Sequence, residues 1–373
     1  MRHVPLSKVY ISDEIKQKVL EAIDSEQYIL GPNCTAFEEE LARYIGTQHC
    51  VLASNWTSAV HMLLLAMKLR PGDEVLVPSL TAFPTVEPVV HAGARPVFVD
   101  IDDSFTMDPD AAAAAFTPRT VGIIPVHLYG HAADLGRLIP LAQKHNLWLI
   151  EDCAQAHGST FDGKRVGSMG LAGGFSFYPS KNLTCFGDGG CITTNDATLA
   201  AAVKKLRNHG RKDKDTHEWV GFNQRFNEIQ AAVGRIQLTK LDELNTGRRR
   251  AADYYRMRLA GLPVVAPTER SYTQHVYHMF VIRTSDRDKL RAFLKSRGVE
   301  TGIHYPIPNH QQPAMTNLYG KPPVLPRTEQ AVKEILSLPM FPSLTTADQD
   351  YVVENISEFF QTNAGTKPAS LAA

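Results

Sequence analysis

Residues 147–194 read LWLIEDCAQAHGSTFDGKRVGSMGLAGGFSFYPSKNLTCFGDGGCITT, and this stretch decides the fold. One apolar run ends in Asp152, and a second, residues 172–178, leads to Lys181 in a loop rich in glycine. Short apolar runs bounded by polar and turn residues predict buried strands of a parallel sheet. Because ligands bind at the carboxyl ends of such strands, we expect one carboxylate and one amine to lie at neighbouring strand ends.

An amine and a carboxylate in this arrangement have a specific chemical use. Partial burial lowers the pKa of a lysine, as a Schiff-base nucleophile requires. A carboxylate at the next strand end can hold a protonated ring nitrogen. Together these are the groups with which a protein makes pyridoxal phosphate an electron sink. Taken singly, a lysine after a strand is commonly a solvated loop residue and an aspartate commonly a helix cap, so the hypothesis depends on the surrounding sequence.

The surrounding motifs strengthen the hypothesis of a pyridoxal phosphate site. IEDCAQAHGS (150–159), FSFYPSKN (175–182) and GDGG (187–190) resemble those of the pyridoxal-phosphate-dependent sugar aminotransferases of the DegT and StrS type. The resemblance extends from about Pro5 to Phe360. It implies fold type I, related in architecture to aspartate aminotransferase: an α/β fold with a large domain, whose mostly parallel sheet is flanked by helices, and a smaller C-terminal α/β domain.

The length of 373 residues predicts two domains. Helical spacing predicts helices near 14–24 and 36–44, and alternating strands and helices then predict parallel strands with right-handed crossovers. We expect residues 1–260 to form the large cofactor-binding domain with its N-terminal helices, and 261–361 the small domain. Residues 362–373 are small and polar, which predicts a disordered tail.

Composition excludes several classes of function. The 39 basic and 39 acidic residues balance, so we expect no nucleic-acid or membrane partner. Five cysteines form no CxxC pair, which argues against a disulfide framework or zinc site and for a cytoplasmic protein. No apolar run reaches membrane-spanning length and no signal sequence is evident. We predict no metal.

The cofactor phosphate is expected at the start of a helix. Thr57 and Ser58 stand where a helix begins, so their backbone N–H groups would be unpaired and would favour an anion, although ordinary capping explains such residues equally well. The resemblance assigns both to the phosphate, together with the hydroxyl of Ser176. It also implies that Asn223 reaches the phosphate of a neighbouring subunit in a homodimer with shared active sites. Asn227 is a weaker candidate for that role, with capping as the alternative.

The resemblance assigns further residues to the cofactor ring and to the substrate. Lys181 is the expected Schiff-base lysine, Asp152 the partner of the ring nitrogen, and Gln155 a donor to the phenolic oxygen. Relatives cover the ring with an aromatic side chain, but ungapped counting puts Ala82 there, with Phe83 next to it, so either can face the ring. The GIHYPIP loop suggests that the substrate lies near His304, Tyr305 and His310, although histidines beside proline-rich turns are often structural.

The implied function is an aminotransferase that moves an amino group from L-glutamate or L-glutamine to a nucleotide-linked 3-keto or 4-keto sugar, in amino-sugar biosynthesis. A keto-inositol of an aminocyclitol pathway is an alternative acceptor that the sequence does not separate. Two other classes remain: a cofactor-dependent dehydrase and a non-catalytic, cofactor-binding regulator. Lys181 argues against the dehydrase, in which a histidine commonly replaces the lysine.

Overall fold

The structure is a computed structural model that describes residues 2–362. Thr362 is the last residue of the final helix, and the rest of the predicted tail lies outside the described residues. None of the helices within residues 2–362 combines the length and the apolar character that crossing a bilayer requires.

Helices and strands alternate along most of the chain. The α-helices are α1 (Asp13–Asp24), α2 (Pro32–Ile45), α3 (Trp56–Ala66), α4 (Glu87–His91), α5 (Pro109–Ala115), α6 (Leu135–Lys144), α7 (Ala197–Leu206), α8 (Glu228–Leu259), α9 (Arg287–Ser296), α10 (Pro313–Tyr319), α11 (Pro326–Glu334) and α12 (Thr346–Thr362). Short 3₁₀ turns are η1 (Phe83–Thr85), η2 (Leu128–Gly130) and η3 (Asn309–Gln311). The strands are β1 (His49–Ala53), β2 (Glu74–Pro78), β3 (Arg95–Val99), β4 (Thr120–Ile123), β5 (Trp148–Asp152), β6 (Thr160–Phe161), β7 (Lys164–Arg165), β8 (Ala172–Ser176), β9 (Gly190–Thr194), β10 (Thr273–Gln274), β11 (Phe280–Arg283) and β12 (Ile335–Leu338).

The large sheet has seven strands in the order β1-β9-β8-β5-β4-β2-β3. Neighbours from β8 to β3 pair in parallel, whereas β9 pairs antiparallel with both β1 and β8. β9 is therefore the one strand of this sheet that runs against the others. The predicted, mostly parallel sheet is confirmed.

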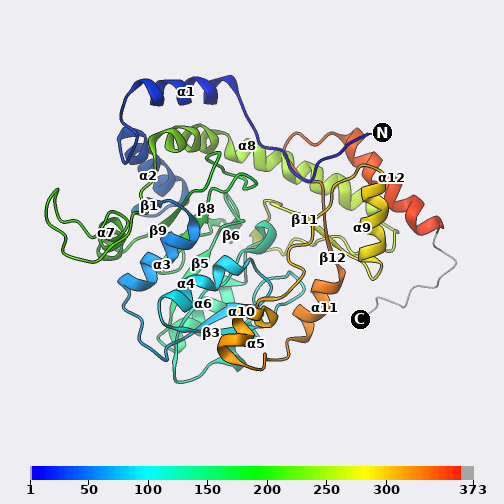
Figure 1. Ribbon diagram of the computed structural model, residues 1–373. Helices are drawn as coiled ribbons and strands as arrows, with labels where there is room; N and C mark the ends of the chain where they lie inside the picture. The colour runs from blue at the N-terminus through cyan, green and yellow to red at the C-terminus, as the bar shows by residue number, and fades with distance from the viewer. Residues whose placement is uncertain (1, 363–373) are drawn as a thin grey trace.

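The sheet is buried on both faces because its strands alternate apolar side chains between two cores. Leu52 and Leu149 belong to one core, together with side chains of α2, α5, α6 and α8. Val51 and Ile150, each one residue away, belong to the other, together with side chains of α3, α4 and α7. Successive strand residues point to opposite faces, so each strand needs apolar residues throughout. The result is a sheet between two helical layers (Figure 1).

A third core lies around the antiparallel pair β11 and β12, with α9 and α12 packed against it. The C-terminal half of α8 contributes Ala252, Tyr255 and Leu259 to this core, and the N-terminal segment contributes Val4. Figure 1 shows α8 running from the large sheet to this smaller unit. A smaller α/β unit thus follows the large one, as predicted, but one helix serves both. The division at residues 260/261 stays a prediction.

Strand pairing brings the two expected ends together. β5 lies beside β8 in parallel, with Glu151 opposite Gly173 and Asp152 opposite Gly174. Lys181 follows five residues after the end of β8. The neighbouring strand ends predicted from residues 147–194 are therefore present.

Gly190 allows the start of β9 to lie against the start of α3. A Cβ atom there would be 2.3 Å from the Trp56 nitrogen and 2.6 Å from the Asn55 carbonyl carbon, both backbone atoms. We predict that Gly190→Ala lowers the free energy of unfolding by about 1–3 kcal/mol, because backbone must move to accommodate the methyl group. Gly187→Ala is the control, since its Cβ would meet only the flexible end of Gln230. Urea unfolding of both variants measures the difference, and equal losses would contradict the prediction.

Candidate active site

One cavity collects six of the residues predicted from the sequence. It has a volume of about 220 Å³, and the predicted residues on its wall are Thr57, Ala82, Asp152, Gln155, Ser176 and Lys181. The other residues on its wall are Asn55, Trp56, Thr81, Pro84, Thr85, Val126, Ala154, Tyr178, Asp188 and Gly189. These residues come from the ends of β5 and β8, the start of α3 and the segment after β2, so the topology of the sheet builds the cavity.

Lys181 reaches this cavity from the loop after β8. Burial lowers the pKa of Lys181 to about 8, against the opposing effect of the Asp152 charge. At pH 7 about one molecule in ten then carries the uncharged amine, far more than for an exposed lysine. A lysine in this state can act as a nucleophile and as a proton carrier.

Asp152 is a buried carboxylate with few hydrogen-bond donors. Its Oδ1 accepts from the Ala154 backbone N–H (3.0 Å) and its Oδ2 from the Thr85 hydroxyl (2.8 Å). Thr85 also contacts the Thr81 hydroxyl at 3.0 Å. Burial raises the pKa of Asp152, although both hydrogen bonds and the Lys181 charge act in the opposite direction. A carboxylate with this balance has room for one more cationic donor, which fits the protonated ring nitrogen of pyridoxal phosphate.

Gln155 is held by two partners. Its Oε1 accepts from the Tyr129 backbone N–H (2.8 Å), which fixes the amide orientation, and its Nε2 donates to the Tyr305 hydroxyl (3.1 Å). The second hydrogen on Nε2 is left for a ligand. Burial, followed by the Asp152 charge, raises the pKa of Tyr305 to about 12. Tyr305 therefore stays a neutral phenol at the edge of the site.

The start of α3 differs in one respect from the prediction. Asn55 is the N-cap, and its Oδ1 accepts from the Ser58 backbone N–H at 2.7 Å. The expectation that the Ser58 N–H is unpaired is therefore wrong, because a side-chain cap satisfies it. Within residues 2–362 the Thr57 N–H has no acceptor, so Thr57 keeps the donor that an anion would use.

The structure places Ala82 and Phe83 in different surroundings. Ala82 lines the cavity, whereas Phe83 packs, half-buried, against the core around α3 and α4. The small side chain therefore faces the cavity, and the aromatic one contributes to packing.

The histidines of the GIHYPIP region and the two asparagine candidates also lie in different surroundings. The His304 Nδ1 lies 2.8 Å from the Ser337 hydroxyl, and burial, followed by the positive charge of Lys181, lowers the pKa of His304 to about 4. His310 instead contacts Ser79 and Glu329 and lines a separate cavity of about 510 Å³.

Asn223 is exposed and lies outside the Lys181 cavity. Asn227 caps α8 by accepting from the Gln230 N–H, as its alternative interpretation had it.

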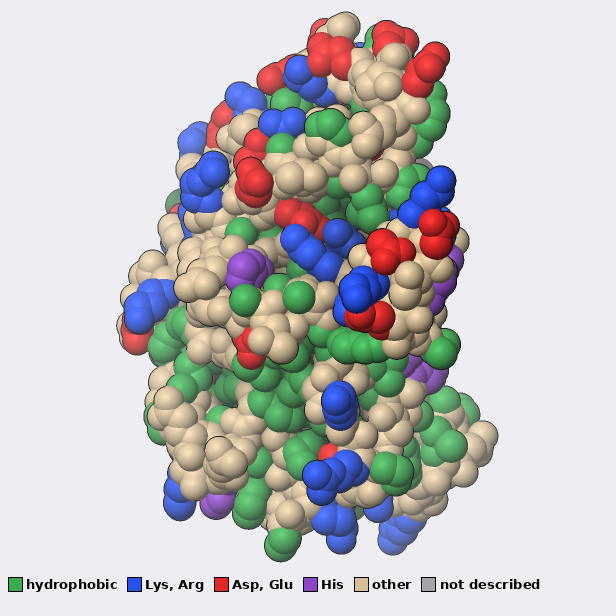
Figure 2. Space-filling view, turned by 90° about the vertical axis from the view of Figure 1, so that its left-hand side faces the viewer, with side chains coloured by type: hydrophobic (Ala, Val, Ile, Leu, Met, Phe, Trp, Pro, Cys, Tyr) green, Lys and Arg blue, Asp and Glu red, His purple; other side chains and the backbone are tan. Residues whose placement is uncertain are grey.

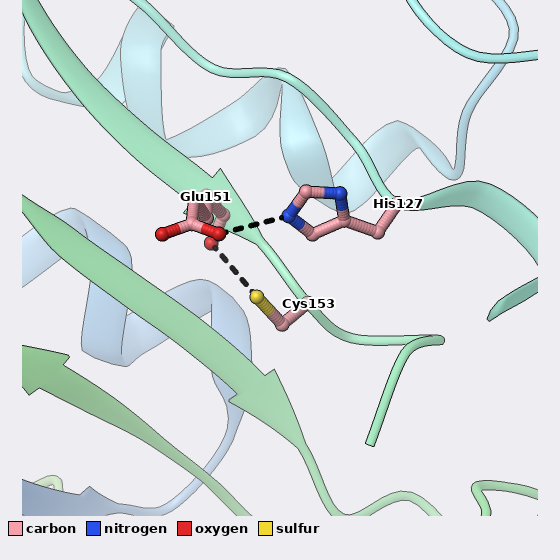
Figure 3. Close-up of side chains that lie close together, drawn as sticks. All are labelled: His127, Glu151 and Cys153. Atoms are coloured by element: carbon pink, nitrogen blue, oxygen red, sulfur yellow. Dashed lines mark hydrogen bonds and ion pairs between the residues drawn. The ribbon is translucent and has the colours of Figure 1, made fainter. Parts of the chain in front are cut away.

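Behind the site, Glu151, His127 and Cys153 lie close enough together to suggest a metal centre (Figure 3). The side-chain oxygens of Glu151 and the ring nitrogens of His127 already have hydrogen-bond partners. Glu151 Oε1 accepts from the backbone N–H groups of Met169 and Gly170, and Oε2 from that of Gly167 and from the His127 ring. His127 Nδ1 accepts from the Ala133 N–H, so the ring proton sits on Nε2, facing Glu151.

Cys153 donates to a backbone carbonyl and not to the carboxylate. Burial alone would raise the pKa of Glu151, but the His127 and backbone hydrogen bonds hold it below its usual range. The cluster is a satisfied network that ties residues 167–170 to β5, next to Asp152.

Sequence reasoning missed Thr85, Tyr129 and the Glu151 network. Thr85 lies 67 residues from Asp152, and no local pattern marks it. Because side chains alternate along β5, Glu151 and Asp152 point to opposite faces of the sheet. This alternation is the one feature of the sequence that indicates a buried carboxylate at Glu151.

A lysine and a carboxylate at adjacent ends of parallel strands, in this sheet order, are the arrangement expected of a pyridoxal-phosphate enzyme of fold type I. Comparison with known proteins agrees: the DegT/DnrJ/EryC1/StrS aminotransferase family matches residues 9–357, and the chain belongs to this family.

Among curated relatives, dTDP-3-amino-3,4,6-trideoxy-alpha-D-glucose transaminase of Streptomyces venezuelae is 42% identical over 93% of this chain and 92% of its own. UDP-N-acetyl-3-dehydro-alpha-D-glucosamine 3-aminotransferase of Acidithiobacillus ferrooxidans is 43% identical, over 90% of each chain. A pleiotropic regulatory protein of Geobacillus stearothermophilus is 43% identical over 95% of this chain and 97% of its own.

Solved structures show the same architecture. DesV of Streptomyces venezuelae, in complex with a ketimine intermediate, gives a TM-score of 0.93 at 40% identity, over 96% of this chain and 99% of that one. NtdA of Bacillus subtilis, with bound cofactor PMP, gives a TM-score of 0.87 at 31% identity, over 94% of this chain and 83% of that one. The predicted family, fold class and enzyme class are confirmed.

The Glu151 network yields a stability prediction. In Glu151→Gln, either orientation of the amide points an NH₂ group at two donors, so we expect a loss of about 3 kcal/mol in the free energy of unfolding. Glu39→Gln on the exposed face of α2 is the matched control. Urea denaturation measures both, and a loss below about 1 kcal/mol for Glu151→Gln would show that the network is dispensable.

Thr85 yields a prediction about pH. Thr85→Val keeps the shape of the side chain but removes the hydrogen bond that lowers the pKa of Asp152. The pKa of Asp152 then rises further, so the acid limb of the kcat profile moves to higher pH, and kcat falls by about tenfold or more at neutral pH. Thr120→Val, buried at the opposite end of the sheet, is the control. An unchanged acid limb would mean that Thr85 does not govern the ionisation of Asp152.

Proposed function

We propose that the cavity of this aminotransferase holds pyridoxal phosphate, with Lys181 as the residue that bonds it and Asp152 as the partner of its ring nitrogen. The observation that carries the proposal is the meeting of these two side chains on one cavity wall. When bound, the cofactor supplies an electron sink for the carbon that loses its proton. Asp152 keeps the ring nitrogen protonated, on which that capacity depends.

The other cavity residues have roles that follow from their hydrogen-bonding groups. The free Thr57 N–H and the Ser176 hydroxyl would hold the phosphate at the start of α3. Ala82 would face the ring, and the second amide hydrogen of Gln155 would meet the phenolic oxygen. The Lys181 amine, whose pKa burial lowers to about 8, would take the proton from the alpha carbon of the donor and deliver it to the cofactor, and would carry it back in the reverse direction.

We also propose that two copies of the chain share their active sites, with Asn223 of each reaching the phosphate of the other. Asn223 is exposed in the single chain, and exposed hydrophobic residues lie near it in sequence: Trp219, and Val220 with 96% of its surface accessible. Tyr178, on the cavity wall, is also exposed. Figure 2 shows hydrophobic side chains spread across the face on the left of Figure 1. These features are typical of a subunit interface.

The proposed acceptor is a nucleotide-linked 3-keto or 4-keto sugar, and the proposed donor L-glutamate or L-glutamine. Support for the acceptor comes from relatives named for dTDP- and UDP-linked sugars at 42–43% identity over most of their length. His304 and Tyr305, beside Lys181 and Gln155, are the proposed substrate contacts, whereas His310 faces a different cavity. A cytoplasmic location is part of the proposal, supported by the cysteine content.

An acceptor screen tests this function. Purified protein with pyridoxal phosphate and L-glutamate or L-glutamine is offered dTDP- and UDP-linked 3-keto and 4-keto hexoses, with a keto-inositol in parallel. Mass spectrometry should find an amino-sugar nucleotide with the wild type, and at least about a thousandfold less with Lys181→Ala, which lacks both nucleophile and proton carrier. A higher kcat/KM for the keto-inositol would replace the nucleotide-sugar proposal with the aminocyclitol one.

A further inference from the structure

A second, much smaller cavity lies against the loop that carries Lys181. Its volume is about 20 Å³, which is enough for one particle the size of a water molecule or a chloride ion. Its walls come mainly from residues 7–10 of the N-terminal segment, residues 179–184 of the loop, and one face of α8. Lys181 lies on the walls of both this cavity and the candidate active site.

The charged side chains on this wall are all basic. They are Lys8, Lys181 and Arg248, and no Asp or Glu is among the described residues that form the wall. Ser180 and Gln237 add a hydroxyl and an amide group. A small enclosed space with basic groups around it and no carboxylate has a positive potential, which favours an anion over a water molecule.

Arg248 is buried, with 4% of its surface exposed, yet most of its donors have no partner. Its Nη1 donates to the carbonyls of Tyr277, His278 and Met340, at 3.2 Å each. Of the five guanidinium N–H groups, the one on Nε and the two on Nη2 have no acceptor within residues 2–362. Buried donors without an acceptor cost stability, so these three groups are suited to a ligand.

Arg248 also has no carboxylate to balance its charge. Burial, the one influence on the pKa of Arg248, lowers it to about 10, so the guanidinium is still charged at neutral pH. Arg207, the other buried arginine of the described chain, pairs with Glu38 at 2.6 Å. A buried charge without a partner of opposite sign is costly. An anion in the small cavity would give Arg248 the partner that Glu38 gives Arg207.

Hydrogen bonds within the chain hold the walls of this cavity in place. Gln237 Nε2 donates to the Tyr10 carbonyl at 2.8 Å, and the Met340 N–H donates to the Leu6 carbonyl at 3.0 Å. These bonds fix the N-terminal segment where it crosses α8 (Figure 1). Gln237 and Arg248 share a buried face of α8, because their spacing of eleven residues is about three helical turns. A ligand would therefore bind a preformed site.

We propose that the small cavity is a binding site for one monovalent anion of the halide class, such as chloride, held by the Nε and Nη2 groups of Arg248. Its volume is too small for phosphate or for the carboxylate of a substrate. The bound anion balances the charge of Arg248 and stabilises the packing of the N-terminal segment on α8. This site lies beyond the proposed transamination and does not rest on it.

Bromide reveals such a site by diffraction, because bromine scatters anomalously. Crystals of the full-length, cofactor-loaded protein are grown in sodium bromide, and data are recorded at the bromine absorption edge. We expect an anomalous peak in the small cavity, within hydrogen-bonding distance of the Arg248 guanidinium. The absence of a peak at this place, whatever binds elsewhere on the molecule, overturns the proposal.

Melting temperatures show whether the anion binds in solution. Sodium chloride replaces sodium gluconate at constant ionic strength, since gluconate is too large for the cavity. We expect the wild type to gain about 2 °C and then to reach a plateau, because a ligand of the folded state stabilises it by mass action. Arg248→Met should lose this gain. Arg207→Met is the matched control: it also removes a buried guanidinium, but one that Glu38 balances, so the gain should remain.

Two results in solution overturn the proposal: a gain in the wild type that does not saturate, and an equal gain in Arg248→Met. A bromide peak without a saturable gain would mean an adventitious ion only, and would also overturn it. The measurements on the wild type need no variant, so they decide the question even if Arg248→Met fails to fold. Neither measurement involves amino-group transfer, so a failure here leaves the proposed function untouched.

Discussion

The parallel pairing of β5 with β8 is the constraint on which the rest of the site depends. β5 ends in two consecutive carboxylates, Glu151 and Asp152, both buried, which point to opposite faces of the sheet. Their surroundings give them opposite properties. Four donors surround Glu151 and its pKa falls, whereas two donors reach Asp152 and its pKa rises. The number of donors, more than the depth of burial, separates a structural carboxylate from one that is ready for a ligand.

This difference is organised along the strand. Glu151 accepts hydrogen bonds from the N–H groups of Gly167, Met169 and Gly170 and so fixes the chain that leads into β8. β8 in turn delivers Lys181 next to Asp152. The satisfied network around Glu151 thus holds Lys181 and Asp152, which has fewer donors, in place. Such support is common where a rigid scaffold carries a reactive site.

Much of this site is predictable from residues 147–194, because the residues that form it lie close together in the sequence. Two apolar runs predicted adjacent buried strands, and Asp152 and Lys181 stood at their ends. Gln155 and Ser176 lay within the same motifs and also line the cavity. What sequence could not predict depends on contacts between distant residues. Thr85 reaches Asp152 across 67 positions, and His278 reaches Asn182 across 96. The expectation for Ser58 is wrong because Asn55, three residues earlier, is the cap that accepts from its N–H.

The central claim, that Lys181 is the residue that bonds pyridoxal phosphate, is tested most directly by covalent trapping. Protein incubated with the cofactor is reduced with sodium borohydride and digested, and the modified peptide is identified by mass spectrometry. The account predicts the cofactor on Lys181, with little on any other lysine, and no such preference for Lys181 in protein that is unfolded before the cofactor is added. Attachment chiefly to another lysine, or no attachment to Lys181 in the folded protein, would contradict it.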